Sequence, residues 1–493
     1  MTTAVGPARA QEALWRPMIS AMGKTAGGAI ASGLLSALGT KIIALMLGPG
    51  SVALLQTLQQ LRDGTLAAAT ANGKTALVQG ASALEGVERR EYLRTVALIF
   101  AGATLLVALA IVVVSGQIVR WSRLPAASGQ LLPWLAVTIA LLSVFVFLTA
   151  ILNALREIGK LALLQLASPM VSAMVAWPVA MEVRAGHPVA MAFFLLLPAA
   201  ATVAAAAFAL WGHREQIREW FQGSGRWWTA GASRHFLSIS GAMLASGLVA
   251  TTVLLAVRGS ITRRESLAMT GQFDAAWNIS MNQVTLILGS VQTYYLPALS
   301  AAKNDRERGR RIRGMLLVAT LATVPATVAL AALKPLVVSV FYSHAFAASP
   351  AFLRWTLPGD YLKVSAWVLA APMLATREMG TFLALDLLTQ AIFLGSAMWL
   401  ARIIEPAEGA AIGFLLSYAA YFALCYAYAR SRYGFRFSAI GLAAWLTGLL
   451  LVLGASASAW GDTMLHPARA AAWILLAVGF SAGFAMYMRG REA

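Results

Sequence analysis

Long apolar runs recur along the whole chain and predict its class. About fourteen of them reach the length that an α-helix needs to cross the hydrocarbon core of a bilayer. Short polar connections separate the runs, so consecutive helices should mostly be antiparallel neighbours. We expect an all-α polytopic membrane protein with spans near residues 19–46, 51–79, 95–116, 131–152, 161–183, 189–212, 235–257, 268–299, 315–341, 358–376, 381–401, 409–429, 439–460 and 470–488.

Composition agrees with this class. Of the 493 residues, 59% are hydrophobic and only 12% are charged, whereas soluble domains carry about 25% charged residues. Mean hydropathy is +0.72. The first apolar run is too long for a cleavable signal peptide, and no small-residue cleavage site follows it, so we expect it to be retained.

Lys and Arg are divided unequally between the two sets of connections. The N-terminal tail and the loops on its side hold about 23 of these residues, and the opposite loops hold about 7, which by the positive-inside rule places both termini in the cytoplasm. We therefore expect a multi-pass protein of the bacterial inner membrane. The densest cluster, KNDRERGRRIR at 303–313, lacks interleaved aromatic residues. We therefore expect it to set the orientation of the protein in the membrane and to attract anionic lipid head groups rather than to bind nucleic acid.

Two basic connections hint at an internal repeat. Each is polar and runs into an apolar span, and Arg94 and Arg313 take equivalent places in them. We expect an N-terminal lobe at 1–230, a C-terminal lobe at 231–432, each of six helices and related by pseudo-symmetry, and two added spans at 433–493. Transporters built from such repeats bind substrate between them.

The stretch from Lys41 to Lys74 carries charges where lipid is expected. Charges at membrane depth are expensive and usually face a protein interior or a water-filled cavity. Lys41, like Lys24, either lines such a cavity or extends to the membrane surface. Arg62 is expected to face a neighbouring helix or to pair locally.

A polar stripe follows the second span. At 100° per residue, one face collects two glutamines, a carboxylate, a threonine and a lysine, namely Gln56, Gln60, Asp63, Thr70 and Lys74. The eighth span has a similar stripe of Asp274, Asn278, Thr285 and Gln292, with Asn282 at its edge. Both stripes suit a water-filled path, and the alternative is hydrogen bonding between helices.

Two later spans add ionisable candidates. Asp360 and Lys363, three residues apart at the expected start of the tenth span, could form a local ion pair. Asp386 lies one turn from Gln390 in the eleventh span. A carboxylate of this kind either titrates during ion coupling or accepts a structural hydrogen bond.

The chain contains no convincing enzyme or metal motif. GKT occurs at 23–25 and 73–75, but neither copy has the leading glycine of a phosphate-binding loop. Cys425 is the single cysteine, and the five histidines have no metal-ligand spacing. We therefore expect no cofactor, metal site or enzymatic activity, and interpret the chain as a secondary transporter or flippase.

Several stretches resemble Wzx-type flippases, which translocate lipid-linked oligosaccharides. They are KIIALMLGPGSVALL at 41–55, TYYLPALS at 293–300, GDYLKV at 359–364 and the acidic position Asp386. The O-antigen and enterobacterial common antigen branch of the polysaccharide and lipopolysaccharide exporters is the most similar. The resemblance implies a two-lobed, fourteen-helix fold of the multidrug/oligosaccharidyl-lipid/polysaccharide superfamily.

The same resemblance implies a substrate and partners. The substrate would be an undecaprenyl-diphosphate-linked glycan, moved to the periplasmic leaflet by alternating access. Cations at Lys41, Lys74 and the Asp360/Lys363 pair would meet the diphosphate, the polar stripes would meet the sugars, and a polysaccharide polymerase and chain-length proteins would be partners. The alternatives are a cation-coupled multidrug exporter, which would favour an acidic cavity, a lipid II flippase, and a scaffold without transport.

Overall fold

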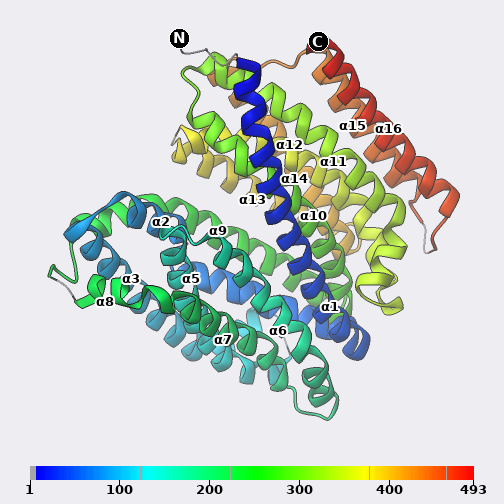
Figure 1. Ribbon diagram of the computed structural model, residues 1–493. Coiled ribbons are helices and arrows are strands. Elements are labelled where there is room, and N and C mark those ends of the chain that lie inside the picture. Colours follow the sequence, from blue (N-terminus) through cyan, green and yellow to red (C-terminus); the bar gives the residue numbers. More distant parts are fainter. Residues whose placement is uncertain (1–6, 123–124, 223, 377, 462–463, 493) are drawn as a thin grey trace, which may run out of the picture.

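The computed structural model describes residues 7–122, 125–222, 224–376, 378–461 and 464–492 and, with few exceptions, side chains from Ala31 onward. In this part of the chain every regular element is a helix (Figure 1). The elements in chain order are α1 (Pro7–Ala69), α2 (Lys74–Ala83), α3 (Gly86–Val113), α4 (Ser115–Ser122), η1 (Ala126–Leu131), α5 (Leu132–Ala154), α6 (Ile158–Arg184), α7 (Ala190–Leu210), η2 (Trp211–His213), α8 (Arg214–Gln222), α9 (Ala230–Arg264), α10 (Leu267–Ser300), α11 (Asp305–Phe341), η3 (His344–Phe346), α12 (Ser349–Ala375), α13 (Met379–Leu400), α14 (Pro406–Tyr433), α15 (Ala439–Ser458) and α16 (Pro467–Glu492).

The all-α membrane fold is confirmed. Within the described residues, 11 helical stretches are long and apolar enough to cross a membrane. Helices α10 and α12, which carry several of the predicted site residues, are not among them, and α1 contains two predicted spans. Each predicted span except 51–79 therefore corresponds to a long helix or to one arm of α1.

The helices form two lobes (Figure 1). Helices α3, α5, α6 and α7 pack with the two arms of α1 and with α2, and helices α10 to α14 form the second lobe. Helices α15 and α16 pack against α11 on the edge of the second lobe that faces away from the first. Helix α9 contacts α1, α2 and α3 as well as α10 and α13, so it lies along the seam between the lobes.

The turn between the first two predicted spans lies at Gly48. Its backbone is left-handed and extended (φ 74°, ψ −174°), a conformation that favours glycine. The two arms of α1 meet there, and Pro49 packs directly on α10. A Cβ atom added to Gly271 of α10 would lie 2.0 Å from the Pro49 carbonyl oxygen, so the lobes touch at this turn through bare backbone.

The expectation of one continuous helix at 51–79 is wrong. Helix α1 ends at Ala69 and α2 begins at Lys74, and between them Ala71 and Asn72 both have φ of 48°. The Asn72 amide donates to the Ala67 carbonyl (2.7 Å) and the Gly73 amide to the Thr70 carbonyl (2.9 Å). These turn bonds replace the helical ladder, because Asn tolerates left-handed backbone better than most residues.

Candidate functional site

A buried ion pair joins the α9–α10 hairpin. Arg258 Nε donates to Asp274 Oδ1 at 2.7 Å, and the two side chains are 4% and 0% exposed. Arg258 Nη1 also donates to the Gln56 carbonyl of α1 (3.3 Å), so the pair reaches the first lobe. The sequence prediction included Asp274 and Gln56 and missed Arg258, which lies one residue beyond the expected end of its span.

The predicted stripe of α10 passes from a buried to an exposed environment. Asp274 is buried, Asn278 is half-buried, and Asn282 and Thr285 are exposed. The side chain of Gln292 lies outside the described residues. The buried end of the stripe is therefore structural, and the end at Asn282 offers amide and hydroxyl groups to a ligand.

The predicted stripe of the second span does not hold as one face. Gln56 is buried, and the Gln60 amide donates to the Thr251 hydroxyl of α9 (3.4 Å). Asp63 is 57% exposed and pairs with Arg62 at 2.7 Å, which confirms the local pairing expected for Arg62. Thr70 is buried and donates back to the Leu66 carbonyl (2.8 Å).

Lys74 leaves the stripe because the helix breaks before it. It is the first residue of α2 and is exposed. The side-chain amide of Asn72 holds the break against α9 by donating to the Met243 carbonyl (3.0 Å). Gly73 packs so closely on Phe236 that a Cβ atom would lie 2.1 Å from the ring.

Lys41 bridges the two lobes. Its ammonium group donates to the Val340 carbonyl at 2.6 Å, in the last turn of α11, where carbonyl groups lack helical partners. The contact lies near the Gly48 turn and supports lobe closure at that end. The side chain of Lys24 lies outside the described residues.

The predicted ion pair between Asp360 and Lys363 is wrong. Helix α12 begins at Ser349, earlier than expected, so Asp360 lies deep in the lobe and is fully buried. Its two carboxylate oxygens accept from the Ser280 hydroxyl at 2.8 and 2.7 Å. Lys363 instead contacts the Met281 sulfur (3.2 Å) and lies 5.0 Å from the centre of the Tyr418 ring.

Asp386 completes a polar cluster in the second lobe. Its Oδ2 accepts from the Ser246 hydroxyl of α9 at 2.6 Å, and the charge of Lys363 acts on both Asp360 and Asp386. The structure thus gathers these three predicted residues, whereas Asp63 and Lys74 lie on the first lobe. No group of three His, Cys, Asp or Glu side chains with metal-binding geometry occurs among the described residues.

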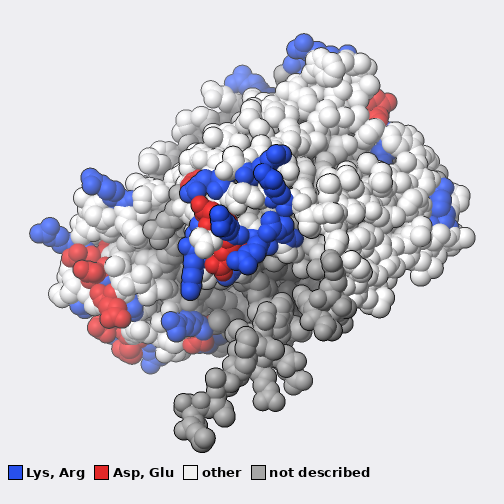
Figure 2. All heavy atoms as spheres, turned by 90° about the horizontal axis from the view of Figure 1, so that it is seen from above, with Lys and Arg blue, Asp and Glu red and all other residues white. Residues whose placement is uncertain are grey.

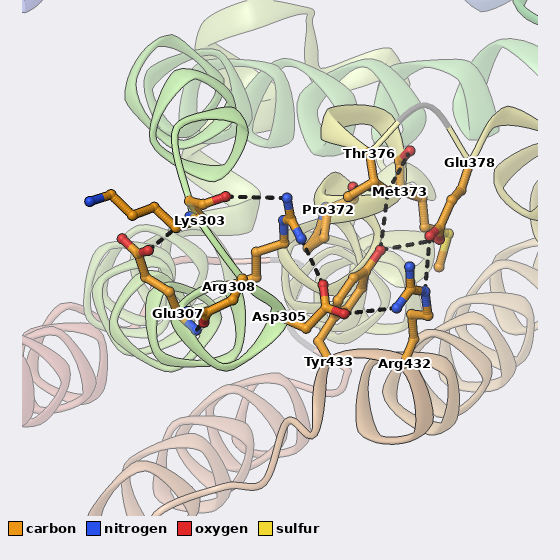
Figure 3. A network of polar contacts seen from close by, with 12 residues as sticks. Lys303, Asp305, Glu307, Arg308, Pro372, Met373, Thr376, Glu378, Arg432 and Tyr433 are labelled. Carbon is orange, nitrogen blue, oxygen red and sulfur yellow. Dashed lines mark hydrogen bonds and ion pairs between the residues drawn. The ribbon is translucent and has the colours of Figure 1, made fainter.

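A second polar network lies at the ends of α11, α13 and α14 (Figure 3). Arg432 donates to Glu378 Oε1 (3.1 Å) and to Asp305 Oδ2 (2.8 Å), and Arg308 donates to Asp305 Oδ1 (2.6 Å). Burial raises the pKa of Glu378, but bonds from Tyr428, Arg432 and Tyr433 outweigh it and hold the pKa below its usual range. Figure 2 shows this end of the molecule, where Lys and Arg surround a few acidic side chains.

Sequence comparison finds a partial match to one kind of protein. No family model matches the chain. Over 155 residues it is 26% identical to the lipid III flippase of Escherichia coli strain K12, and the flippase of the same name from Shigella flexneri matches equally. The stretch covers 31% of this chain and 37% of each relative, so the chain aligns with little more than a third of their length.

Comparison of structures covers nearly the whole chain. The lipid II flippase MurJ in an inward closed conformation superposes with a TM-score of 0.72 and 13% identity, over 95% of this chain and 99% of MurJ. An inward-facing multidrug transporter of the MATE family superposes with a TM-score of 0.66 and 17% identity, over 82% of this chain and 98% of the transporter. The chain therefore has the two-lobed fold shared by MurJ and MATE transporters.

Proposed function

We propose that the protein is a flippase that moves an undecaprenyl-diphosphate-linked oligosaccharide from the cytoplasmic to the periplasmic leaflet. The observation that carries the proposal is the 155-residue match to a lipid III flippase. The MurJ-like fold supports it, since that relative also flips a lipid. The O-antigen class of glycan, and a polymerase and chain-length proteins as partners, belong to the same proposal.

An exposed cation at the start of α2 suits a diphosphate. Lys74 is exposed at the first turn of α2, where free backbone amides and the helix dipole favour an anion. Asn282 and Thr285 are exposed on α10, and such groups hydrogen-bond to sugars. A diphosphate with about two negative charges that moves outward gains roughly 4–5 kcal/mol per 100 mV of inside-negative potential.

Closure at one end supports alternating access. The Lys41–Val340 contact, the Gly271–Pro49 contact and the Arg258–Gln56 bond all join the lobes around the Gly48 turn. By the positive-inside rule this end faces the periplasm. The conformation therefore corresponds to one closed toward the periplasm, and transport would require these contacts to separate.

Replacement of Lys74 tests the substrate site. We expect Lys74→Ala to reduce glycan export at least tenfold in a strain whose own flippase is deleted, because one charge-assisted contact to phosphate is worth about 1.5–3 kcal/mol. Arg402→Ala, which removes an exposed charge after α13, is the matched control and should export normally. Normal export by Lys74→Ala at normal protein level would overturn the assignment.

A cation-coupled multidrug exporter is the second candidate. The carboxylates of Asp360, which is buried, and Asp386, which is half-buried, favour it, because carboxylates at membrane depth can carry a coupling ion or bind an organic cation. An exporter would restore drug resistance to a sensitive strain without affecting glycan export. A lipid II flippase, favoured by the MurJ fold, would instead rescue cells from lysis after depletion of their own lipid II flippase.

A further inference from the structure

A groove of about 420 Å³ opens between α14 and α15. Its floor is formed by Phe422 and Tyr426 of α14, Phe437 of the connection, and Trp445 of α15. Arg430 and Arg436 line the end where the two helices are connected. One end of the groove is therefore cationic and the remainder is aromatic and apolar.

The floor is held rigidly. Phe422 and Trp445 stack with their ring centres 4.7 Å apart and their planes inclined by 7°. The Trp445 indole donates to the Ser365 hydroxyl (3.0 Å), and the Trp445 carbonyl accepts from the Tyr361 hydroxyl (2.7 Å). A preformed surface of this kind loses little conformational entropy when a ligand binds.

A tight turn brings the two arginines to the same end. Gly434 ends α14 in left-handed backbone (φ 61°), which favours glycine. The Phe435 amide then donates back to the Ala429 carbonyl (3.1 Å), and the Phe435 side chain is fully buried. The chain is thereby folded back so that Arg436 lines the same groove as Arg430.

The two arginines lack a counter-charge in the described part of the protein. Both are exposed and form no ion pair there. The nearby carboxylates are already occupied, Glu378 by Arg432 and Asp305 by Arg308 and Arg432 (Figure 3). Residues 430–436 hold three arginines and no Asp or Glu, and Arg430 and Arg436 both line the groove, so this end of the groove is positive.

The groove faces the bilayer rather than the seam between the lobes. Helix α15 packs on α11, α12 and α16, at the edge of the second lobe that faces away from the first (Figure 1). From Arg430 to Phe422 the floor extends roughly 12 Å along α14, most of the roughly 15 Å of one leaflet's hydrocarbon. Its depth fits a lipid with its head group at the membrane surface.

We infer that this groove binds one anionic phospholipid of the leaflet on the side of the chain termini. Arg430 and Arg436 hold the phosphate, because guanidinium groups bind phosphate oxygens in pairs. The upper part of an acyl chain covers Phe422, Trp445 and Leu442. The site is separate from the proposed substrate site, and its occupant is a resident lipid rather than transported cargo.

Native mass spectrometry of the full chain in detergent tests the inference. We expect phosphatidylglycerol to bind at least tenfold more tightly than phosphatidylcholine, and the double variant Arg430→Gln/Arg436→Gln to lose that preference. The matched control is Arg306→Gln/Arg310→Gln, which removes the same charge from exposed positions of α11 outside the groove and should keep the preference. If both double variants weaken phosphatidylglycerol binding equally, the preference comes from general surface charge, and the proposed lipid site is wrong.

Two further measurements identify the occupant. Leu442→Glu places a negative charge beside the apolar floor without touching the arginines, and should also abolish the preference; unchanged binding would overturn the acyl-chain part. Excess inorganic phosphate should leave the bound lipid in place, and displacement would show a simple phosphate site. Displacement by undecaprenyl diphosphate at equal concentration would assign the groove to the substrate and likewise overturn the inference.

Discussion

The pair of Arg258 and Asp274 shows how strongly one residue depends on another inside this molecule. Both side chains are almost completely buried, and removing one partner of a buried pair leaves an uncompensated charge that costs about 3–5 kcal/mol. We expect Asp274→Ala to lower the free energy of unfolding by this amount. Thermal unfolding in detergent measures the loss.

The double variant Arg258→Met/Asp274→Leu is the control for this prediction. Replacement of both charges by apolar side chains of similar size is often neutral or stabilising, so most of the lost stability should return. If the double variant is no more stable than Asp274→Ala, the stability lost in Asp274→Ala came from packing and not from the unpaired charge of Arg258.

The spacing of the two residues in the sequence indicates this pair, although a hydropathy profile does not detect it. Arg258 and Asp274 are equally far from Ser266 in the short α9–α10 connection, so an antiparallel hairpin brings them level. For Asp360 both the predicted depth and the predicted partner were wrong. Helix α12 begins at Ser349, earlier than expected, and Ser280 lies on another helix, so no spacing within α12 could reveal that partner.

At the scale of the element, the break between α1 and α2 is the most consequential departure from a simple span. Asn72 has φ of 48° and donates to the Met243 carbonyl. We expect Asn72→Val to destabilise the protein by about 2–3 kcal/mol, from about 1–2 kcal/mol for left-handed backbone and about 1 kcal/mol for the lost bond. Asn72→Gly should lose only the bond.

Unfolding of the two variants in urea or by heat distinguishes these contributions. Equal losses for Asn72→Val and Asn72→Gly would mean that the backbone conformation contributes little. The Asn72–Gly73 dipeptide is itself a turn signal, so this break was accessible from the sequence. The long apolar run around it concealed the signal, because hydropathy averages over about one span.

The network at Glu378 predicts a pH dependence. The bonds from Tyr428, Arg432 and Tyr433 lower the pKa of Glu378 in the folded protein. A lowered folded pKa adds stability above the unfolded pKa, about 4.3 for Glu, and this stability is lost as pH falls through the folded value. We therefore expect wild type to unfold at higher temperature than Glu378→Gln at neutral pH, and the difference to vanish in acid.

Differential scanning fluorimetry of both proteins between about pH 7 and pH 3 measures this difference. A constant difference across the range would show that Glu378 contributes through its shape and neutral hydrogen bonds instead. The sequence predicted the basic character of this end and its topological role. It could not predict the network, which joins three connections that lie far apart in the chain.

At the scale of the whole molecule, the contact of Gly271 with Pro49 controls how closely the lobes meet. A Cβ at Gly271 would lie 2.0 Å from the Pro49 carbonyl oxygen, so Gly271→Leu should separate the lobes at the Gly48 turn. In a Cys425→Ser background, spin labels at the exposed positions Leu45 and His344 should move apart. Electron–electron double resonance measures the distance.

Gly314→Leu is the matched control. Gly314 is exposed on α11, and a Cβ there would meet nothing within 4 Å, so the label distance should stay as in the parent. An unchanged distance in Gly271→Leu would show that the backbone yields locally without moving the lobes. The two-lobed arrangement itself was predicted from the sequence, whereas the boundary at residue 230 stays a prediction, because α9 packs on both sides.

The position of α9 has a thermodynamic consequence. Asn72 of the first lobe binds the Met243 carbonyl, and Asp386 of the second lobe binds the Ser246 hydroxyl, less than one helical turn away. A ligand that bound at Asp386, as proposed, and shifted this turn would also change the free energy of the break beside Lys74. Linkage is reciprocal, so a ligand at Lys74 would then change the affinity at Asp386 by the same factor.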